Sequence, residues 1–584
     1  MKYSSIPSAQ ALVQHCKSKG IQHIVISPGS RNAPLTIGFT ENPFFSCFSI
    51  VDERCAGFFA LGIAQQTKSA VALVCTSGSA LLNYYPAIAE AFYSNISLVI
   101  VSADRPAYKI DVGDGQTIRQ DDVFHRHIGY AANLKQDVTH ATAKVRNYLK
   151  NLPAEEALAP YQLEIQDYND TQIDKALTTA IHQDTPVHIN IPFEEPLYNV
   201  LEQPTVVPFV PVTEEPLEER TKSLEQFTET WNKASKKMIL VGVNEPNSIE
   251  QHFLDELAED PSVLVFTETT SNLHHPSFLT SIDSIIAPIE KAATAHTLFE
   301  QLRPAILLTF GGLIVSKKIK AFLRTYKPEQ HWHVGTKKAN NTFFSLSHHF
   351  KNDPNTFFSD FLSGVLPRTS NYQLFWTNIR DAYVAKRGDY ISQISFSDFL
   401  AFHHITKSIP SGYQLQLANS STVRYAQLFD IERTITVYCN RGTSGIDGST
   451  STAIGASLFC STPTLLITGD LSFFYDSNAL WNNYLRADFR IIVVNNGGGG
   501  IFRILPGMTN TENYERYFET SHELNAAQLC AMYQIEYQAV RSEESLQEVL
   551  ADFYLKSDQP KLLEVHTPRI LNEKILLSYF DFIS

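Results

Sequence analysis

The chain has 584 residues, 43% of them hydrophobic, which is enough apolar material for several packed domains and argues against a disordered protein. Its formal net charge of −14 argues against binding to nucleic acid or to an anionic membrane surface. No apolar run approaches the roughly 20 residues that span a bilayer, and residues 1–5 lack a signal-peptide core, so we expect a cytoplasmic protein. The seven cysteines form no Cys-x-x-Cys pair, so the sequence does not indicate a disulfide framework or a structural zinc site.

Residues 1–198 alternate short apolar runs with helical patterns, and small or charged residues follow each run. Strands are predicted at residues 23–26, 47–51, 71–75, 98–102 and 187–191, and one long helix is predicted from the turn at residues 76–79 through Phe92. Repeated strand–turn–helix units specify a doubly wound parallel sheet, whose ligands bind at the carboxyl ends of the strands. The polar residues that follow these strands are therefore candidates for ligand binding.

Three prolines, Pro204, Pro208 and Pro211, predict an extended linker over residues 199–216, because proline cannot continue a helix. A second α/β domain is predicted over 217–370, with strands at 238–241, 263–266, 306–309 and 332–334, and a third over 385–584. The expected fold is α/β, with three doubly wound domains and mainly parallel sheets. The residue types suited to ligand chemistry are concentrated in the first and third domains.

Two predicted strands of the third domain end at groups that can bind a metal ion. Residues 467–468 lead into Gly469-Asp470-Leu471-Ser472, and residues 493–494 lead to Asn496, 26 positions after Asp470, and to the glycine run 497–500. A carboxylate, an amide oxygen and an open backbone supply the hard oxygen ligands of Mg²⁺, which phosphates and water usually complete. Each half alone is also typical of an ordinary turn. The pair at this spacing indicates a clamp for Mg²⁺ and a diphosphate.

Charged residues at the predicted strand ends are the other candidates. Glu53 lies between a strand and an apolar helix, where a carboxylate also has the plain explanation that it complements the helix dipole. Six cations lie at strand ends or glycine turns: Arg31, Arg105, Arg119, Lys317, Arg424 and Arg441. A surface ion pair would explain any one of them. Six in an acidic chain indicate a site for substrates with several carboxylates, which arginine binds bidentately.

The Gly469-Asp470 opening followed by Asn495-Asn496 resembles the cofactor signature of thiamine-diphosphate enzymes, with Leu471 in place of the usual glycine. The resemblance implies pyrimidine, central and pyrophosphate domains, with Mg²⁺ (or Mn²⁺ in its place) bound by Asp470, Asn496 and the Gly498 carbonyl. It makes Glu53 the catalytic glutamate, which hydrogen-bonds N1′ of the cofactor pyrimidine and favours the imino form of its 4′-amino group. The other implied cofactor contacts are Ser444, Ile446, Gly469, Leu471, Ser472, Ile501 and Phe502. From sequence alone, Ile446 is equally well explained as an ordinary loop residue.

Motifs along the whole chain resemble one branch of that family, the 2-succinyl-5-enolpyruvyl-6-hydroxy-3-cyclohexene-1-carboxylate synthases of menaquinone biosynthesis, to which the Gly-Asp-Leu-Ser variant belongs. The motifs lie at residues 27–31, 52–54, 75–78, 104–106, 116–120, 440–442, 444–448, 469–472 and 501–502.

This resemblance implies a thiamine-diphosphate-dependent transferase, with its active sites at the subunit interface of a homodimer or homotetramer. It implies decarboxylation of 2-oxoglutarate, followed by 1,4-addition of the succinyl-semialdehyde–thiamine carbanion to isochorismate. It assigns Ser420, Arg424 and Arg441 to the 2-oxoglutarate-derived group, and Arg31, Arg105, Gln116 and Lys317 to isochorismate. Ser30 is a further substrate contact, and Ile501, Phe502 and Leu505 form an apolar pocket wall that excludes water.

Other interpretations stay open at this level. Other thiamine-diphosphate 2-oxoacid decarboxylases commonly carry a neighbouring histidine pair in the first domain, whereas here Arg126 separates two histidines, and an acetohydroxyacid-type synthase would need flavin. An inactive family member would be expected to lose Glu53 or a metal ligand. A nicotinamide oxidoreductase is disfavoured, because no Gly-x-Gly-x-x-Gly follows the first strand. Gly115, Gly497 and Gly500 depart from the residues common in the branch, which leaves the fine substrate contacts open.

Overall fold

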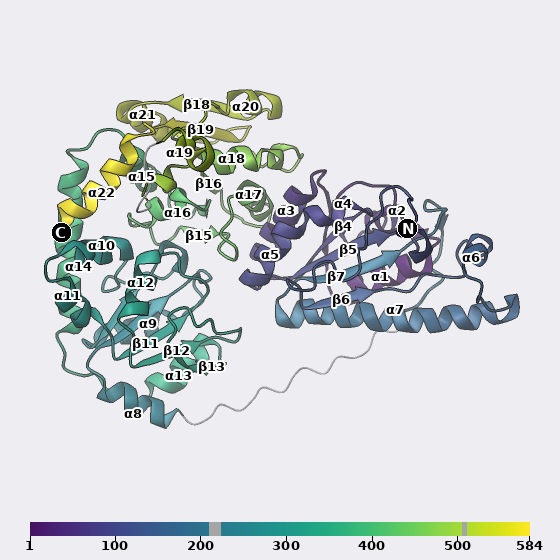
Figure 1. Ribbon diagram of the computed structural model, residues 1–584, viewed down its shortest axis with the longest axis horizontal. Coiled ribbons are helices and arrows are strands. Elements are labelled where there is room, and N and C mark those ends of the chain that lie inside the picture. The colour runs from purple at the N-terminus through teal and green to yellow at the C-terminus, as the bar shows by residue number, and fades with distance from the viewer. Residues whose placement is uncertain (209–223, 505–510) are drawn as a thin grey trace. The chain divides into compact units, whose positions relative to one another are not determined.

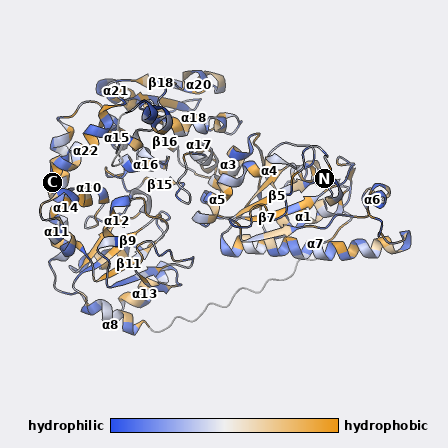
Figure 2. Ribbon diagram, viewed as in Figure 1, coloured by the Kyte–Doolittle hydropathy of each residue, from blue (hydrophilic) through white to orange (hydrophobic). Residues whose placement is uncertain are grey.

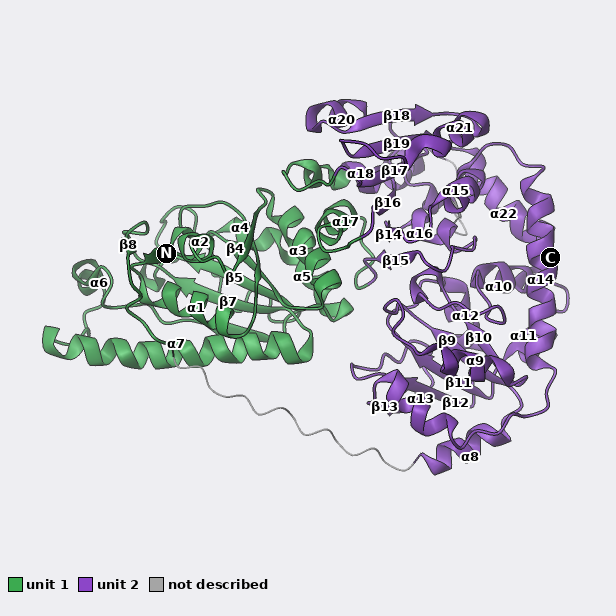
Figure 3. Ribbon diagram, turned by 180° about the vertical axis from the view of Figure 1, so that it is seen from behind, with its two compact units in different colours: residues 1–216, 442–461, 475–486 green, residues 217–441, 462–474, 487–584 purple. Residues whose placement is uncertain are grey.

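The computed structural model of the protein describes residues 1–208, 224–504 and 511–584 (Figure 1). The chain divides into two compact units (Figure 3). Unit 1 consists of Met1–Pro216, Gly442–Ser461 and Tyr475–Arg486, and unit 2 of Leu217–Arg441, Thr462–Phe474 and Ala487–Ser584. Part of the predicted linker, residues 209–216, lies outside the described residues.

Unit 1 is built on a parallel sheet whose described strands have the order β3-β2-β4-β5-β7-β6. Their bounds are β2 His23–Ile26, β3 Ser46–Ser49, β4 Val71–Cys75, β5 Leu98–Asp104, β6 Tyr130–Asn133 and β7 Val187–Pro192. Two short strands, β1 (Tyr3–Ser4) and β8 (Val200–Leu201), pair antiparallel outside this sheet. The central strands are apolar without alternation because both faces of the sheet are covered, so the strands predicted in this region are confirmed to within two residues.

Helices cover both faces of this sheet. Helices α1 (Pro7–Ser18), α2 (Ala33–Thr40) and α7 (Glu155–Gln183) share one apolar core with it. The opposite face carries α3 (Glu53–Thr67) and α5 (Tyr85–Ser94), and α17 (Ser449–Ser457) packs against α3. The remaining described helices of the unit are α4 (Ser79–Asn83), α6 (Thr142–Tyr148) and the 3₁₀ turns η1 (Ala107–Lys109) and η3 (Ser477–Leu480).

The prediction of one continuous helix from the 76–79 turn through Phe92 was wrong. The segment forms two helices, α4 and α5, with Tyr84 between them. Pro86 lies in the first turn of α5 and has no N–H to donate to the carbonyl of Leu82, so a helix ends before it and a new one begins.

Unit 2 contains two further parallel sheets. The first has the order β10-β9-β11-β12-β13 among its described strands: β9 Lys237–Val241, β10 Val263–Phe266, β11 Ile306–Phe310, β12 Gln330–Val334 and β13 Leu346–Phe350. One face packs on α8 (Glu225–Lys233), α9 (Gln251–Glu259) and α13 (Pro354–Leu362). The other face packs on α10 (Ile282–Lys291), α11 (Ala295–Leu302), α12 (Lys317–Thr325) and α14 (Tyr372–Ile391). The 3₁₀ turn η2 (Thr269–Ser271) follows β10.

The second sheet of unit 2 has the order β15-β14-β16-β17-β19-β18 among its described strands. These are β14 Gln414–Leu417, β15 Thr436–Cys439, β16 Thr464–Gly469, β17 Arg490–Asn495, β18 Glu536–Val540 and β19 Lys561–His566. Its helical elements are α15 Asp398–Ser408, α16 Ser421–Ala426, α18 Asp470–Tyr475, α19 Glu512–Tyr514, α20 Ala527–Tyr533, α21 Glu543–Phe553, α22 Leu571–Ile583, η4 Gly500–Ile504 and η5 Glu515–Glu519. The expected fold class, α/β with mainly parallel sheets, is therefore confirmed.

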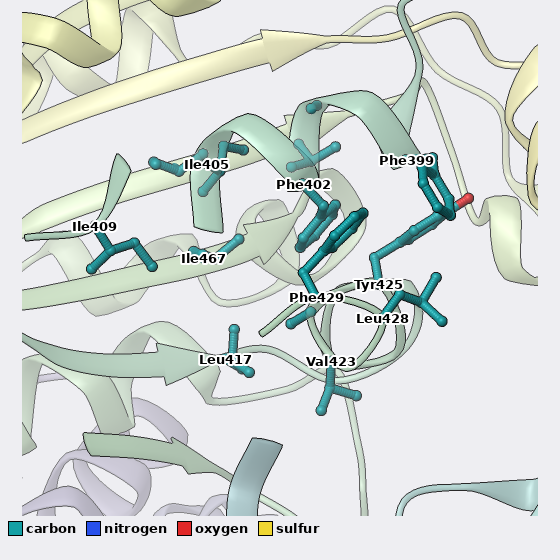
Figure 4. Packing of buried hydrophobic residues seen from close by; sticks show 14 of the residues in the cluster. Phe399, Phe402, Ile405, Ile409, Leu417, Val423, Tyr425, Leu428, Phe429 and Ile467 are labelled. Atoms are coloured by element: carbon teal, nitrogen blue, oxygen red, sulfur yellow. The ribbon is translucent and has the colours of Figure 1, made fainter. Parts of the chain in front are cut away.

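Apolar packing fixes the helices that border the candidate site. Figure 4 shows Phe402 of α15 beside Tyr425 of α16, and their rings stack with centroids 5.3 Å apart. Val423 of the same helix belongs to the same buried cluster. In the hydropathy colouring of Figure 2, the strands of the sheets are mostly orange, whereas the helices carry blue and orange sides, as expected for sheets enclosed by amphipathic helices. No helix within the described ranges is long and apolar enough to cross a membrane.

Candidate active site

Glu53 is the first residue of α3, and the residue before it holds the start of this helix in place. The Asp52 carboxylate caps the helix by accepting hydrogen bonds from the backbone N–H groups of Arg54 (3.0 Å) and Cys55 (3.2 Å). Its other oxygen accepts from the side chain of Asn478 at 2.8 Å. Burial is the main cause that raises the pKa of the half-buried Glu53 carboxyl. Such a carboxyl can share a proton with a neighbouring nitrogen atom.

The turns after β2 and β4 approach each other closely, which explains their small residues. A Cβ atom on Gly29 would lie 2.3 Å from the Cβ of Thr76, so no larger residue fits at position 29. Gly78 has φ +89° and donates its N–H to Gln120 at 2.8 Å. The Ser77 hydroxyl donates to the Gln116 carbonyl at 3.0 Å. The predicted Gln116 therefore lies on a loop tied to the carboxyl end of β4, and its own side chain is exposed.

Arg31 and Arg105 lie at the ends of β2 and β5, as predicted, and both have protein partners. Arg31 is buried, donates to the Phe193 carbonyl at 3.0 Å and pairs with Glu195 at 3.0 Å, while its Nε has no hydrogen-bond partner. Arg105 donates from Nε to the Gly115 carbonyl at 2.8 Å and lines an open pocket. Part of each guanidinium is thus used to hold the neighbouring chain.

Two further predicted side chains, those of Ser30 and Arg119, are exposed, unlike that of the buried Arg31. Arg119 is 79% exposed and pairs with Asp111 at 2.7 Å, which is a surface ion pair.

The loop that carries Ser444 and Ile446 is anchored by Glu90 of α5. The buried Glu90 carboxylate accepts hydrogen bonds from the N–H groups of Gly442 and Thr443, both at 2.6 Å, and from the Thr443 hydroxyl at 2.8 Å. All of these residues belong to unit 1. One side chain therefore sets the start of the loop that the sequence assigns to the cofactor.

The loop carrying Ser444 and Ile446 then leads into α17, whose contact with α3 depends on glycine. A Cβ on Gly62 would lie 2.1 Å from the Thr452 carbonyl oxygen, and one on Gly455 would lie 2.1 Å from the Phe59 carbonyl oxygen. The two helices therefore pack with their backbones in close approach.

The predicted metal ligands come from two adjacent strands. Strands β16 and β17 are parallel neighbours with Thr468 opposite Val493, so Asp470 and Asn496 follow the same edge of one sheet. The Asp470 carboxylate accepts from the N–H groups of Leu471 (2.7 Å) and Gly498 (2.9 Å), which ties the two strand ends together.

The Asn496 amide is oriented for a ligand. Its Nδ2 donates to Asp398 at 2.9 Å, which leaves Oδ1 buried without a hydrogen-bond partner. A buried amide oxygen without a partner is unfavourable unless a bound group satisfies it. Together with Asp470 and the adjacent glycine backbone, it supplies the hard oxygen atoms that Mg²⁺ prefers, so the residues present fit the ion. Among the described residues no group of three or more His, Cys, Asp and Glu gathers at a possible metal site, and this clamp contains a single carboxylate.

The backbone after Asn496 requires glycine. Gly497 has φ +75° and Gly498 has φ +150°, conformations that other residues rarely adopt. A Cβ on Gly498 would also lie 2.8 Å from the Glu519 carbonyl oxygen. The Gly498 carbonyl accepts from the N–H of Gly500 at 3.0 Å. This turn leads into η4, where Ile501 and Phe502 are half-buried, whereas Leu505 lies outside the described residues.

Two of the predicted cations of unit 2 lie near acidic side chains, Arg424 near Asp283 and Arg441 near Glu268. Burial lowers the pKa of the Arg424 guanidinium while Asp283 raises it, and the Arg424 Nε is buried without a hydrogen-bond partner. Arg441 is buried and donates to the Asn419 side chain at 2.6 Å. Ser420, with φ 68°, precedes α16, and Lys317 is the exposed first residue of α12.

The structure places the predicted site residues in two groups, one in each unit. Unit 1 holds Ser30, Arg31, Glu53, Arg105, Gln116, Ser444 and Ile446. Unit 2 holds Lys317, Ser420, Arg424, Arg441, Gly469, Asp470, Leu471, Ser472, Asn496, Gly498, Ile501 and Phe502. Each unit thus presents a partial site at the carboxyl ends of its strands.

Known proteins are similar to this chain in the regions that contain the predicted site residues of both units. Residues 7–126 match the thiamine pyrophosphate enzyme N-terminal TPP binding domain, and residues 419–565 match the C-terminal TPP binding domain. Proteins named 2-succinyl-5-enolpyruvyl-6-hydroxy-3-cyclohexene-1-carboxylate synthase align over the whole chain. One from Christiangramia forsetii is 54% identical over 100% of both chains, and those from Flavobacterium johnsoniae and Flavobacterium psychrophilum are 52% and 51% identical over 99% of both.

The chain belongs to this synthase family. It is a thiamine-diphosphate-dependent enzyme, and the predicted membership in the menaquinone-biosynthetic branch is confirmed.

Several residues that contact the predicted site residues have no motif that would have singled them out. His522 Nε2 lies 3.3 Å from the Asp470 carboxylate, and Asp398 accepts from Asn496. Burial raises the pKa of Asp398 to about 6. Glu90 lies more than 350 positions before the loop that it holds. The only signal for these residues is spatial, because their partners are distant in the sequence.

Two of the three glycine departures noted in the sequence have a local explanation. Gly497 suits the positive φ at the turn of the clamp, and a Cβ on Gly500 would lie 3.2 Å from the Asn496 side-chain nitrogen. At Gly115, by contrast, a Cβ would meet no atom of the surrounding structure within 4 Å, so nothing in the structure requires glycine there.

Proposed function

We propose that this synthase removes CO₂ from 2-oxoglutarate and joins the remaining four-carbon unit to isochorismate by 1,4-addition, giving 2-succinyl-5-enolpyruvyl-6-hydroxy-3-cyclohexene-1-carboxylate. The observation that carries this proposal is the full-length similarity to relatives that bear the name of this product. The positions of the predicted residues support it, since the proposed metal ligands and several cations lie at strand ends.

We infer that Mg²⁺ is held by Asp470, the Asn496 amide oxygen and the Gly498 carbonyl, and that Mn²⁺ can replace it. The buried, unpartnered Oδ1 of Asn496 supports this assignment. Thiamine diphosphate, when bound, supplies the electron sink that stabilises the negative charge left by loss of CO₂. The remaining proposed contacts to this cofactor are Ser444, Ile446, Gly469, Leu471, Ser472, Ile501 and Phe502.

Glu53 is the proposed catalytic residue, and its carboxyl would hold a proton against N1′ of the cofactor pyrimidine. Burial supports this role because it raises the pKa of the carboxyl, which makes sharing of a proton with a ring nitrogen more favourable. The Asp52 cap fixes the first turn of α3 and therefore the direction of the Glu53 side chain. Glu53→Gln is expected to bind the cofactor and to lose turnover.

The substrate carboxylates are assigned to the cations. Arg424 and Arg441, with Ser420, would bind the 2-oxoglutarate-derived group, and the buried Arg424 Nε has a donor to spare. Arg31, Arg105, Gln116 and Lys317 would bind isochorismate, with Ser30 nearby in sequence. Glu195 already pairs with Arg31 at 3.0 Å, so a substrate would have to use the donors that this pair leaves free. Ile501, Phe502 and Leu505 would form an apolar wall that excludes water from the reacting carbon.

We propose a homodimer or homotetramer in which Glu53 of one subunit serves the cofactor clamped by another. Light scattering would give the mass of the assembly. Mixing Glu53→Gln subunits with Asp470→Ala subunits would test the shared site, because a mixed dimer would contain one site with both native residues. Recovery of about a quarter of wild-type activity is expected for random pairing of two inactive variants. No recovery after verified exchange would refute the shared site.

The decisive experiment measures CO₂ released from 2-oxoglutarate with thiamine diphosphate and Mg²⁺, with and without isochorismate. The proposed function predicts that release rises strongly with isochorismate and that the coupled product accumulates. Equal release in both conditions would indicate a simple 2-oxoacid decarboxylase. No release despite cofactor binding would move the activity to another oxoacid, such as the substrate of an acetohydroxyacid-type synthase.

A further inference from the structure

A short buried segment of the central sheet region, Glu268–Asn272, connects two parts of the proposed substrate site in unit 2. It follows strand β10 and includes the 3₁₀ turn η2. The Ser271 hydroxyl accepts from the Glu268 N–H at 2.9 Å and donates to the Val241 carbonyl at 2.8 Å. Glu268, Ser271 and Asn272 are each less than a tenth exposed. The segment is therefore fixed to the sheet, and the side chains of its two end residues, Glu268 and Asn272, bond to partners outside it.

Glu268 holds the chain directly before Lys317. One carboxylate oxygen accepts from the Val315 N–H and the other from the Ser316 N–H, both at 2.7 Å. Ser316 is the N-cap of α12, and its hydroxyl accepts from the Ile319 N–H at 3.1 Å. A carboxylate that accepts two backbone N–H groups fixes both the position and the direction of the helix start. The first residue of that helix is Lys317, which the proposed function assigns to isochorismate.

Asn272 holds the strand that leads to Arg441. Its Nδ2 donates to the Val437 carbonyl at 2.9 Å, and its Oδ1 accepts from the Val437 N–H at 2.8 Å. Val437 lies in β15, an edge strand of its sheet, so this amide takes the place of a neighbouring strand at one residue. The strand continues to Asn440, whose carbonyl accepts from Asn419 at 2.7 Å, and then to Arg441.

The charges around Glu268 agree with this arrangement. Burial, helped by the charge of Asp283, raises the pKa of the Glu268 carboxyl to about 7, although the two backbone hydrogen bonds and the charge of Arg441 lower it. Burial also lowers the pKa of the half-buried Lys320 ammonium, while the charge of Glu268 raises it. In its ionised form, this buried acid reduces the repulsion between the cations before a substrate carboxylate binds.

We infer that Glu268 and Asn272 are positioning residues, which set the two substrate-binding cations Lys317 and Arg441 from one rigid segment. This inference rests on the proposed function, in which Lys317 binds isochorismate and Arg441 binds the 2-oxoglutarate-derived group. It predicts that the two residues act on different substrates. Glu268 acts on isochorismate through α12, and Asn272 acts on 2-oxoglutarate through β15.

The test compares KM for each substrate in the Glu268→Gln and Asn272→Ala enzymes, with cofactor affinity measured in parallel. Glu268→Gln keeps the side-chain size but removes one acceptor, so KM for isochorismate is expected to rise about tenfold, the usual size for a lost charge-assisted bond, and more than KM for 2-oxoglutarate. Asn272→Ala should show the reverse preference. Both variants should bind thiamine diphosphate with unchanged affinity.

Asp260→Asn is the matched control. Asp260 is a buried acid whose carboxylate accepts a hydrogen bond from the Ser262 N–H at the opposite, amino-terminal end of β10. Its replacement is therefore expected to lower the stability of the protein without changing KM for either substrate. If Glu268→Gln or Asn272→Ala does not fold, Glu268→Asp and Asn272→Ser replace them, with the same crossed pattern expected.

Equal changes in both KM values, or none, in folded variants would overturn the inference. Wild-type enzyme that makes no coupled product would instead refute the proposed function, so the two failures are distinguishable.

Discussion

Replacing Glu90 tests whether one buried carboxylate sets the loop that is proposed to contact the cofactor. Glu90 is 1% exposed and accepts two backbone N–H groups, from Gly442 and Thr443, at 2.6 Å each. Glutamine at this position keeps the size but has one acceptor oxygen, so one of the two N–H groups loses its partner. Such a loss costs about 2 kcal/mol. If the loop is released in the free enzyme and must be ordered again when the cofactor binds, the same free energy weakens binding about 30-fold.

The assay is a fluorescence titration of thiamine diphosphate at saturating Mg²⁺, with thermal unfolding measured in the same buffer. Ser94→Ala is the matched control, because Ser94 donates to the same carboxylate at 2.9 Å but belongs to α5, so its loss leaves the loop bonds intact. Glu90→Gln should weaken cofactor binding while Ser94→Ala does not. A Glu90→Gln enzyme that is less stable but binds the cofactor with wild-type affinity would refute the reasoning.

Three further predictions follow from the structure. Asp470→Ala should lose the Mg²⁺-dependent part of thiamine diphosphate affinity in an equilibrium titration, and unchanged affinity would exclude Asp470 from the clamp. Arg424→Ala should raise KM for 2-oxoglutarate by at least about tenfold with little change in cofactor affinity; the opposite pattern would assign Arg424 to the cofactor. Burial raises the pKa of Glu268 from 4.5 to about 7, so the folded protein keeps a proton that the unfolded chain releases. The stability that this retained proton contributes is fully present below pH 4.5 and is lost as the pH rises through about 7. Between these two pH values, the free energy of unfolding measured in urea should fall by about 3 kcal/mol more for the wild type than for Glu268→Gln. Parallel plots of unfolding free energy against pH for the two proteins would contradict the raised pKa.

The fold class and the positions of the main motifs follow from local patterns in the sequence. Apolar runs such as Val71–Cys75 are buried on both faces, and a run of this kind ending in small polar residues is characteristic of a strand in a doubly wound sheet. The same rule relates Asp470 to Asn496, since the ends of parallel neighbouring strands meet at one edge of the sheet. Local chemistry also explains the Asp52 cap next to Glu53.

The side chains that support those motifs, by contrast, are identified only in the folded protein. Glu90, Asp398, His522 and Glu268 carry no local signal, because each acts on a partner that is distant along the chain. Their sites depend on which elements pack together, and the same is true of the segments 442–461 and 475–486, which cluster with unit 1 although strands of unit 2 flank them in sequence. A residue's type and neighbours specify its local conformation, but long-range packing determines its contacts. For this reason the chain's motifs could be read from its sequence, whereas the residues that hold them in place could not.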